Sequence, residues 1–247
     1  MVDTGYTAEV FRSIQGEGPY VGVLQVFLRT SGCGLSCRYC DTAFARKRLP
    51  ECTLKGPETS RKIENPVAVD TLVSFVTSLV EASPGVHSLS ITGGEPLEQP
   101  GFLACFIHRS HHLNLPVYLE TNGLAEAAVR DIAPLVDIVS LDIKLPSLCG
   151  RGDLFATYER VLPLFSANEL FCKVVVAEGF EPREFMEAVR LVMRFDYRTP
   201  FIIQPARQVG ACRPVESDKL LECYFDASQH LESVRVIPQC NHLIGLP

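Results

Sequence analysis

Short apolar runs rich in β-branched residues alternate along this chain with longer amphipathic segments. The apolar runs predict strands at residues 23–29, 88–92, 117–120, 138–141, 171–176, 201–204 and 234–237. The segments between them repeat their apolar positions with helical spacing and predict helices at residues 67–81, 101–111, 125–132, 155–165, 182–195 and 216–230. Such alternation is typical of βαβ units. We therefore predict an α/β protein whose mostly parallel sheet curls into a modified, incomplete (β/α) barrel.

Polar residues follow several of the predicted strands at their carboxyl ends. Arg29 and Thr92 end the first two strands, and Glu120, Asp142 and Gln204 end or follow three later ones. Because the carboxyl ends of parallel strands meet at one rim of such a fold, the ligand site is expected there.

The polar segment 46–65 interrupts the alternation and contains two prolines and a glycine. We interpret it as an inserted loop or hairpin and not as a domain boundary. The whole chain, residues 1–247, is then expected to form a single domain.

Composition excludes some classes of protein. Hydrophobic residues make up 47% of the chain, which is enough for a full core, and the mean hydropathy is +0.14. The net charge of −6 and the lack of a lysine and arginine stripe disfavour direct nucleic-acid binding. No apolar run is long enough to cross a bilayer, and the N-terminus lacks a basic region followed by an apolar one, so we expect a cytoplasmic protein.

Three of the ten cysteines, Cys33, Cys37 and Cys40, form a C-x3-C-x2-C pattern. Three thiolates do not complete a structural zinc site, but they can hold three irons of a [4Fe-4S] cluster and leave the fourth iron open. A redox pair of Cys37 and Cys40 would leave Cys33 unexplained, and a zinc ribbon would need a second C-x-x-C. The remaining cysteines are scattered and read as small buried apolar residues: Cys52, Cys105, Cys149, Cys172, Cys212, Cys223 and Cys240.

Two other segments carry candidate chemistry. In the turn 92–96 (TGGEP), two glycines let the backbone approach a ligand, and Glu95 can accept hydrogen bonds from an ammonium group. Ser140, Asp142 and Lys144 share one face of an extended strand. By themselves these residues could equally be a common turn, an exposed Asp–Lys pair, or the Schiff-base lysine of a barrel aldolase.

The cysteine pattern with Tyr39 before its last cysteine, followed by the Gly-Gly-Glu-Pro turn, resembles the radical S-adenosylmethionine (AdoMet) enzymes. The resemblance implies an incomplete barrel of that type. It also implies a catalytic [4Fe-4S] cluster on Cys33, Cys37 and Cys40, with AdoMet on the open iron. The AdoMet-binding positions that it implies are Tyr39, Cys40, Asp41, Gly94, Glu95, Ser140, Asp142, Lys144, Gln204, Pro205, Ala206 and Arg207.

Within those enzymes, the segment 11–18 (FRSIQGEG), Arg29, the pair Asp41-Thr42 and the final residues 245–247 resemble the 7-carboxy-7-deazaguanine synthases over nearly the whole chain. This implies a lyase that converts 6-carboxy-5,6,7,8-tetrahydropterin to 7-carboxy-7-deazaguanine and ammonia by radical ring contraction, in queuosine and 7-deazapurine biosynthesis. Thr42 would bind Mg²⁺. The implied substrate-binding residues are Ile14, Gln15, Gly16, Arg29, Thr92 and Pro247. Expected partners are the pterin substrate, an electron donor such as flavodoxin or ferredoxin, and a second copy in a homodimer.

Two alternatives remain open. A glycyl-radical enzyme activating enzyme shares the cysteine spacing, the turn and an Asp-x-Lys strand end, although Arg29 and Pro247 suit a small heterocyclic acid better than a protein loop. A non-enzymatic zinc-binding scaffold would be colourless. The chain departs from the deazaguanine synthases at Leu243, where a lysine is expected, and in the insertion 46–65. These departures leave the dimer contacts and the reductase-docking face open.

Overall fold

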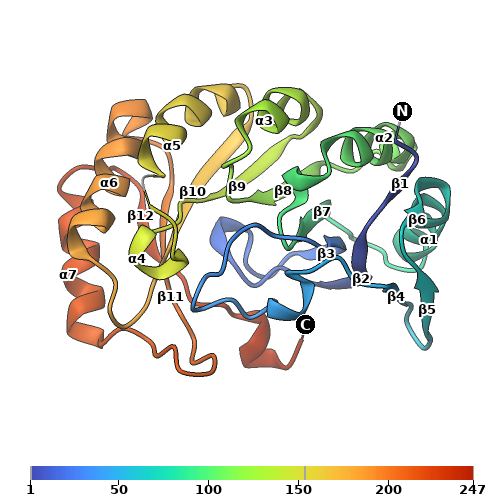
Figure 1. The fold of residues 1–247 in the computed structure, drawn as a ribbon, viewed down its shortest axis with the longest axis horizontal. Coiled ribbons are helices and arrows are strands. Elements are labelled where there is room, and N and C mark those ends of the chain that lie inside the picture. The colour runs from blue at the N-terminus through green and yellow to red at the C-terminus, as the bar shows by residue number, and fades with distance from the viewer. Residues whose placement is uncertain (1, 153, 247) are drawn as a thin grey trace.

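The fold is an open, strongly curved sheet with helices along its outer side (Figure 1). A computed structural model describes residues 2–152 and 154–246. The large sheet has the strand order β12-β11-β10-β9-β8-β7-β3-β2-β4-β5, so its two edge strands are not paired with each other. This arrangement confirms the predicted incomplete barrel.

Seven strands form the parallel part of the sheet, each paired with the next in register. They agree with the seven predicted strands and differ only by one or two residues at their ends. They are β3 (Leu24–Thr30), β7 (Ser88–Gly93), β8 (Val117–Thr121), β9 (Ile138–Asp142), β10 (Glu169–Val176), β11 (Phe201–Pro205) and β12 (Val234–Val236).

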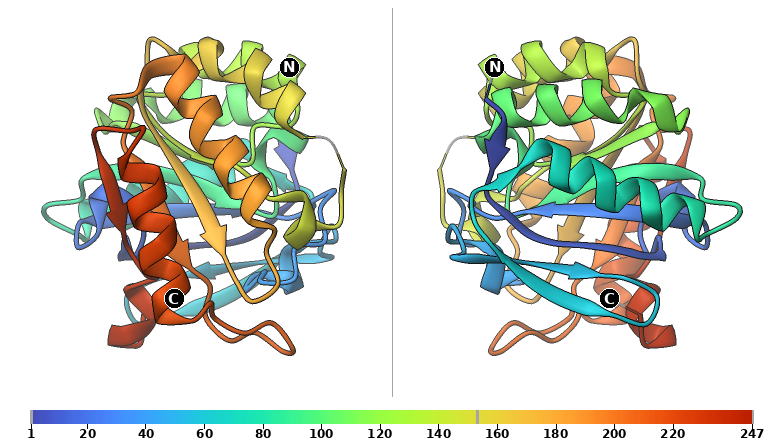
Figure 2. Two further views of the ribbon diagram at one scale, coloured as in Figure 1. Left: turned by 90° about the vertical axis from the view of Figure 1, so that its left-hand side faces the viewer. Right: turned by 90° about the vertical axis from the view of Figure 1, so that its right-hand side faces the viewer.

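The N-terminal part of the sheet was not predicted. The strand β2 (Thr7–Ile14) pairs antiparallel with β3, and on its other side it pairs parallel with β4 (Glu51–Lys55). Charged residues within β2 obscure its apolar pattern in the sequence. The segment 46–65 contains a hairpin, because β4 pairs antiparallel with β5 (Ser60–Glu64) along the sheet edge (Figure 2).

The helices cover the outer face of the sheet in chain order (Figure 1). They are α1 (Val69–Glu81), α2 (Pro100–Ser110), α3 (Glu126–Ile132), α4 (Pro146–Cys149), α5 (Phe155–Val161), α6 (Pro182–Asp196) and α7 (Ser217–Ser228). All six predicted helices are present. The short α4 was not predicted, and none of the seven is both long and apolar enough to span a membrane in the part of the chain described.

Most helix boundaries differ from the prediction by one or two residues, and the local structure explains the differences in two of the helices. Helix α1 begins at Val69 because the two preceding residues form β6 (Val67–Ala68), which pairs with β1 (Thr4–Gly5). The predicted helix 155–165 is divided, because the chain changes to a 3-10 turn at Leu162–Phe165, which contains Pro163. Proline has no backbone N–H to continue the α-helical hydrogen bonds.

The core lies between the outer face of the sheet and the helices. On α1, Leu72, Val76 and Leu79 are spaced along one side and are fully buried. They meet outward-facing aliphatic residues of the sheet such as Val10 and Leu28 in one continuous cluster. The inner, concave face of the sheet carries a second, smaller apolar cluster around Tyr118, Ile138, Phe171 and Ile202, and the polar side chains of that face lie nearer the carboxyl ends of the strands.

We expect the Leu54→Ala substitution in β4 to lower the free energy of unfolding by about 2–5 kcal/mol, because Leu54 is only 1% exposed and belongs to the main core. Urea unfolding measures the effect. Lys62→Ala on the neighbouring strand is the control, because the Lys62 side chain is 66% exposed, and it should change stability by less than about 0.5 kcal/mol. Equal effects of the two substitutions would show that the hairpin is not part of the core.

Candidate functional site

A cavity of about 420 Å³ opens at the carboxyl ends of the parallel strands. Its wall includes Arg29 of β3, Thr92 of β7, Glu120 of β8, Asp142 of β9 and Gln204 of β11. This is the rim at which the sequence places the ligand site.

The structure brings nearly all the predicted site residues to this cavity. Those that line it are Ile14, Gln15, Gly16, Arg29, Cys33, Cys37, Tyr39, Cys40, Asp41, Thr42, Thr92, Gly94, Glu95, Ser140, Asp142, Lys144, Gln204, Ala206 and Arg207. Pro205 is not part of the lining, because it alternates with Gln204 and Ala206 along an extended segment. Pro247 lies outside the described residues.

Backbone hydrogen bonds fix the loop that carries the three cysteines. The amides of Gly32 and Cys33 donate to the carbonyls of Ala45 and Arg46 at 2.8 and 2.9 Å. The guanidinium of Arg46 in turn donates to the carbonyl of Cys37 at 2.6 Å. The loop is therefore held from behind, while its three cysteines line the cavity.

Cys33, Cys37 and Cys40 all line the same cavity, as the three protein ligands of an iron–sulfur cluster would. Within the described residues, no group of three or more His, Cys, Asp or Glu side chains is arranged around one ion. In a [4Fe-4S] cluster each cysteine binds a different iron, so the thiols face a shared space without converging on a point. Burial raises the pKa of Cys33 to about 11 and also raises the pKa of Cys37, so both are protonated thiols until a metal displaces the proton.

The glycine turn after β7 presses against this loop. A Cβ at Gly94 would lie 2.1 Å from the carbonyl oxygen of Gly32, so any larger residue would separate the two segments. Gly93 has a φ of +149°, which only glycine adopts without strain. The turn therefore brings bare backbone to the cavity wall beside the cysteines.

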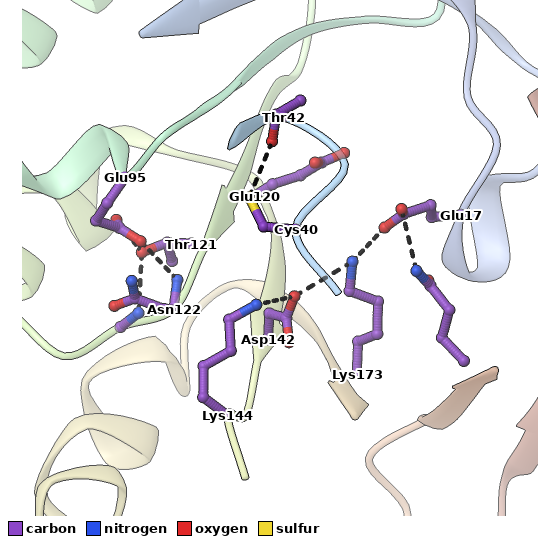
Figure 3. Close-up of polar contacts among 12 residues, drawn as sticks. Glu17, Cys40, Thr42, Glu95, Glu120, Thr121, Asn122, Asp142, Lys144 and Lys173 are labelled. Carbon is purple, nitrogen blue, oxygen red and sulfur yellow. Dashed lines mark hydrogen bonds and ion pairs between the residues drawn. The ribbon is translucent and has the colours of Figure 1, made fainter. Parts of the chain in front are cut away.

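Glu95 joins the same turn to the end of β8 (Figure 3). Its carboxylate accepts hydrogen bonds from the Thr121 hydroxyl at 2.6 Å and the Asn122 amide at 2.8 Å. It also accepts one from the Leu97 amide at 3.0 Å. Burial raises the pKa of Glu95. Much of its hydrogen-bonding capacity therefore fixes the cavity wall, and the remaining lone pairs are available to a ligand.

Four charged side chains of alternating sign cross the floor of the cavity (Figure 3). The Lys144 ammonium lies 2.7 Å from the Asp142 carboxylate, the same carboxylate lies 3.5 Å from the Lys173 ammonium, and Lys173 contacts Glu17. Burial by itself would raise the pKa of Glu17, but the charge and hydrogen bond of Lys173 hold it below its ordinary value. Burial would lower the pKa of Lys173, but Glu17 and Asp142 raise it, so both groups are charged.

Glu17 also holds the C-terminal part of the chain against the opening of the barrel. Its Oε1 accepts hydrogen bonds from the amides of Gln204 at 3.2 Å and Gln239 at 2.6 Å. Gln239 donates to Asp41 at 2.9 Å as well, and the Cys240 amide donates to the Gly16 carbonyl. One carboxylate thus links the end of β2, the strand β11 and the tail.

Two polar atoms in the cavity wall are buried without a hydrogen-bond partner among the described residues, namely Asp142 Oδ1 and Gln204 Oε1. Because buried polar atoms are nearly always hydrogen-bonded, such atoms in a cavity wall indicate a polar ligand. This fits a nucleoside-like group such as that of AdoMet.

On β8, next to β9, Glu120 accepts hydrogen bonds from Gln15 at 2.9 Å and from Thr92 at 2.8 Å. Burial and the negative charge of Glu17 raise the pKa of Glu120. A carboxyl group with a raised pKa therefore lies beside two predicted substrate-binding residues.

Sequence reasoning gave no site role to four charged residues in the wall, namely Glu9, Glu17, Lys55 and Lys173. A signal existed for Lys173, because it interrupts the apolar run FCKVVV, and a lysine buried in a strand requires a counter-charge. Glu9 lies on β2, which was not predicted, and Lys55 lies on β4, which pairs with β2. No local pattern in the sequence therefore places the two side chains together.

Comparison with known proteins defines the class. Residues 27–192 match the Radical SAM superfamily, and the chain carries that fold and its cysteine loop. It is 38% identical over 243 residues to a 7-carboxy-7-deazaguanine synthase of Geobacter sulfurreducens, with 96% of each chain covered. It is 33% identical to that of Methanothermobacter thermautotrophicus, again with 96% of each covered. The chain belongs to the 7-carboxy-7-deazaguanine synthase family of radical SAM enzymes.

A solved structure agrees with the fold. The crystal structure of QueE from Escherichia coli superposes with a TM-score of 0.61 and covers 96% of this chain and 94% of that chain, at 19% sequence identity. At this identity the likeness shows the fold alone.

We expect Lys173→Met to lower the free energy of unfolding by about 3–5 kcal/mol, because it leaves Glu17 as a buried carboxylate without its counter-charge. Chemical denaturation measures the change. The double substitution Lys173→Met with Glu17→Gln removes both charges and should recover roughly half of the loss. A double variant as unstable as the single one would show that the ion pair is not the cause.

We expect Glu120→Gln to make stability less dependent on pH. A carboxyl group with a raised pKa in the folded state destabilises the fold as pH rises from its ordinary value of 4.5 through the folded value. Glu120→Gln should therefore be more stable than the parent at pH 8, and the gain should disappear at pH 4. Thermal melts across this range test the sign, and a gain that grows on acidification would contradict it.

Proposed function

We propose that this chain converts 6-carboxy-5,6,7,8-tetrahydropterin to 7-carboxy-7-deazaguanine and ammonia, the product for which its relatives are named. The observation that carries the proposal is the cavity itself. It gathers the three cysteines, the glycine turn and the predicted pterin-side residues Gln15, Arg29 and Thr42 around one space.

The cofactor side of the cavity would be built from the parallel strands. Cys33, Cys37 and Cys40 would hold the cluster, and the backbone at Gly94 would lie along the methionine end of AdoMet. Asp142 Oδ1 and Gln204 Oε1 would receive hydrogen bonds from its polar groups. When bound and reduced, these cofactors supply the 5′-deoxyadenosyl radical that begins the ring contraction.

The substrate side would be built from the N-terminal strands. Gln15 and Gly16 follow β2 and line the cavity, as does Arg29 of β3, which is opposite Glu9 of β2. A guanidinium presents a planar pair of donors to a carboxylate, which suits the 6-carboxyl group. Glu120, fixed by Gln15 and Thr92, would accept a hydrogen bond from an N–H of the ring.

Thr42 would supply an oxygen to Mg²⁺. Its hydroxyl lies 3.8 Å from the Cys40 sulfur and lines the cavity between the cysteines and the tail. Magnesium keeps most of its waters and needs few protein ligands, so one hydroxyl beside a substrate carboxylate is a plausible coordination set.

The remaining expectations form part of the same proposal. The reaction needs an external electron donor such as flavodoxin or ferredoxin, and we propose a single domain that forms a homodimer. The cysteines of the chain are free thiols, which suits a reducing compartment such as the cytoplasm.

The test is anaerobic reconstitution with iron and sulfide, followed by reduction in the presence of AdoMet, Mg²⁺ and 6-carboxy-5,6,7,8-tetrahydropterin. We expect a brown protein and a product with the mass of 7-carboxy-7-deazaguanine. Cys37→Ala should bind less iron and lose the product by more than about 100-fold, because the cluster loses one of its three ligands. Cys223→Ala on α7, away from the cavity, is the matched control and should behave as the parent.

The outcomes separate the alternatives. A colourless protein with tightly held zinc would contradict the radical chemistry altogether. AdoMet cleavage without the deazapurine product, together with a glycyl radical formed on a protein partner, would identify an activating enzyme instead.

A further inference from the structure

The hairpin β4–β5 places a lysine in the wall of the cavity. Lys55 is the last residue of β4, and it lines the cavity with Glu9 and Phe11 of β2 and Phe27 and Arg29 of β3. The register explains why these side chains meet: Glu9 is opposite Arg29, and on its other side it is opposite Thr53, two residues before Lys55. Side chains two apart on a strand share a face.

Glu9 lies between two cations. Its Oε1 accepts a hydrogen bond from Arg29 Nε at 2.9 Å, and its Oε2 contacts the Lys55 ammonium. The side chains of Glu9 and Arg29 are only 10% and 14% exposed, whereas Lys55 is 40% exposed at the mouth of the group. The net charge of the group is one negative plus two positive charges, or +1.

The contact with Glu9 uses only one side of the Arg29 guanidinium. Over residues 2–152 and 154–246, no hydrogen bond or ion pair is found for its two terminal nitrogens. The hydrogen bond from Nε fixes the plane of the Arg29 guanidinium. Its two terminal nitrogens, the N–H fork, then remain able to donate in parallel to a ligand in that plane. A carboxylate matches that fork in shape and charge.

A flat apolar surface lies beside the free fork. The rings of Phe11 and Phe27 stack at 5.0 Å with an interplanar angle of 8°. The Arg29 guanidinium and the Lys55 ammonium each lie 5.4 Å from the centre of the Phe11 ring. The combination of an aromatic face and a cationic fork suits a planar ring that bears a carboxylate.

We propose that Lys55 is a positioning residue for this carboxylate site. By balancing the charge of Glu9, Lys55 leaves more of the positive charge of Arg29, which also attracts the Asp41 carboxylate, available to the ligand. Without Lys55, Glu9 and Arg29 would form a closed pair of zero net charge, and the fork would attract an anion less strongly. The proposal rests on the proposed function, because the carboxylated ring is the pterin substrate.

The test measures binding and turnover separately on the reconstituted protein with AdoMet and Mg²⁺. The binding probes are 6-carboxypterin and pterin without the carboxyl group, followed by their fluorescence anisotropy. We expect Lys55→Met to weaken binding of 6-carboxypterin about tenfold, the order of one charge-assisted contact, and to leave pterin unchanged. With the tetrahydropterin substrate, KM should rise about as much while kcat stays within about twofold, because the lost interaction holds substrate and transition state alike.

Three further variants make the test specific. Lys62→Met on the exposed side of the same hairpin should behave as the parent. Lys55→Arg keeps the charge and should restore binding. Lys55→Met combined with Glu9→Gln returns the net charge of the group to +1 and should bring 6-carboxypterin affinity back to within about threefold of the parent.

The outcomes are distinct. If the parent makes product but Lys55→Met resembles Lys62→Met, the role of Lys55 is refuted while the proposed function stands. A double variant that binds as weakly as Lys55→Met would refute the charge-balancing role. If the parent neither binds 6-carboxypterin nor forms product, the proposed function itself fails.

Discussion

The ammonium of Lys173, held between the carboxylates of Glu17 and Asp142, is the contact on which the cavity depends. An open barrel has two free sheet edges, and its interior would fill with water unless something joined its two sides. Glu17 does this from the end of β2, since it reaches Lys173 on β10, Gln204 on β11 and Gln239 in the tail. Because the ions are buried, loss of one partner leaves a charge that the interior cannot solvate. The contacts of Glu17 with Lys173, Gln204 and Gln239 are therefore expected to form together.

The ion pairs of Lys173 with Glu17 and Asp142 also affect the charges of other groups in the cavity wall. Lys173 holds the pKa of Glu17 below its ordinary value, and the charge of Glu17 adds to burial in raising the pKa of Glu120. Asp142 is held by Lys144 and Lys173 through one oxygen, so its other oxygen remains free to meet a ligand. The charges that hold the fold together are thus the same ones that shape what it can bind.

The sequence predicted the parts of the fold whose signal is local. The parallel strands are continuous apolar runs, and the cysteine loop and the glycine turn are contiguous motifs, so each could be found in one window of the chain. β2 was missed because the charged residues Glu9 and Arg12 interrupt its apolar pattern, although the strand is buried on both faces. The contact of Glu17 with Lys173 joins positions 156 residues apart, and the meeting of Glu9 with Lys55 depends on the register of two strands. Spacing in the sequence carries no information about either pair.

The parallel strands form one side of the cavity, and the antiparallel pair β2–β3 with the hairpin β4–β5 forms the other. The residues that select the ligand on the second side can therefore change separately from the cysteine loop. The cysteines, the glycine turn and the ends of β9 and β11 belong to the parallel half of the sheet and the loops that follow its strands. The wall that carries Glu9, Arg29 and Lys55 comes from the antiparallel pair β2–β3 and from the hairpin β4–β5 at the outer edge of that pair. A strand added at a sheet edge brings side chains to an existing face without disturbing the strands already paired. Lys55 reaches Glu9 in this way, so the charge beside Arg29 can be tuned while the cysteine loop stays fixed by its own backbone contacts.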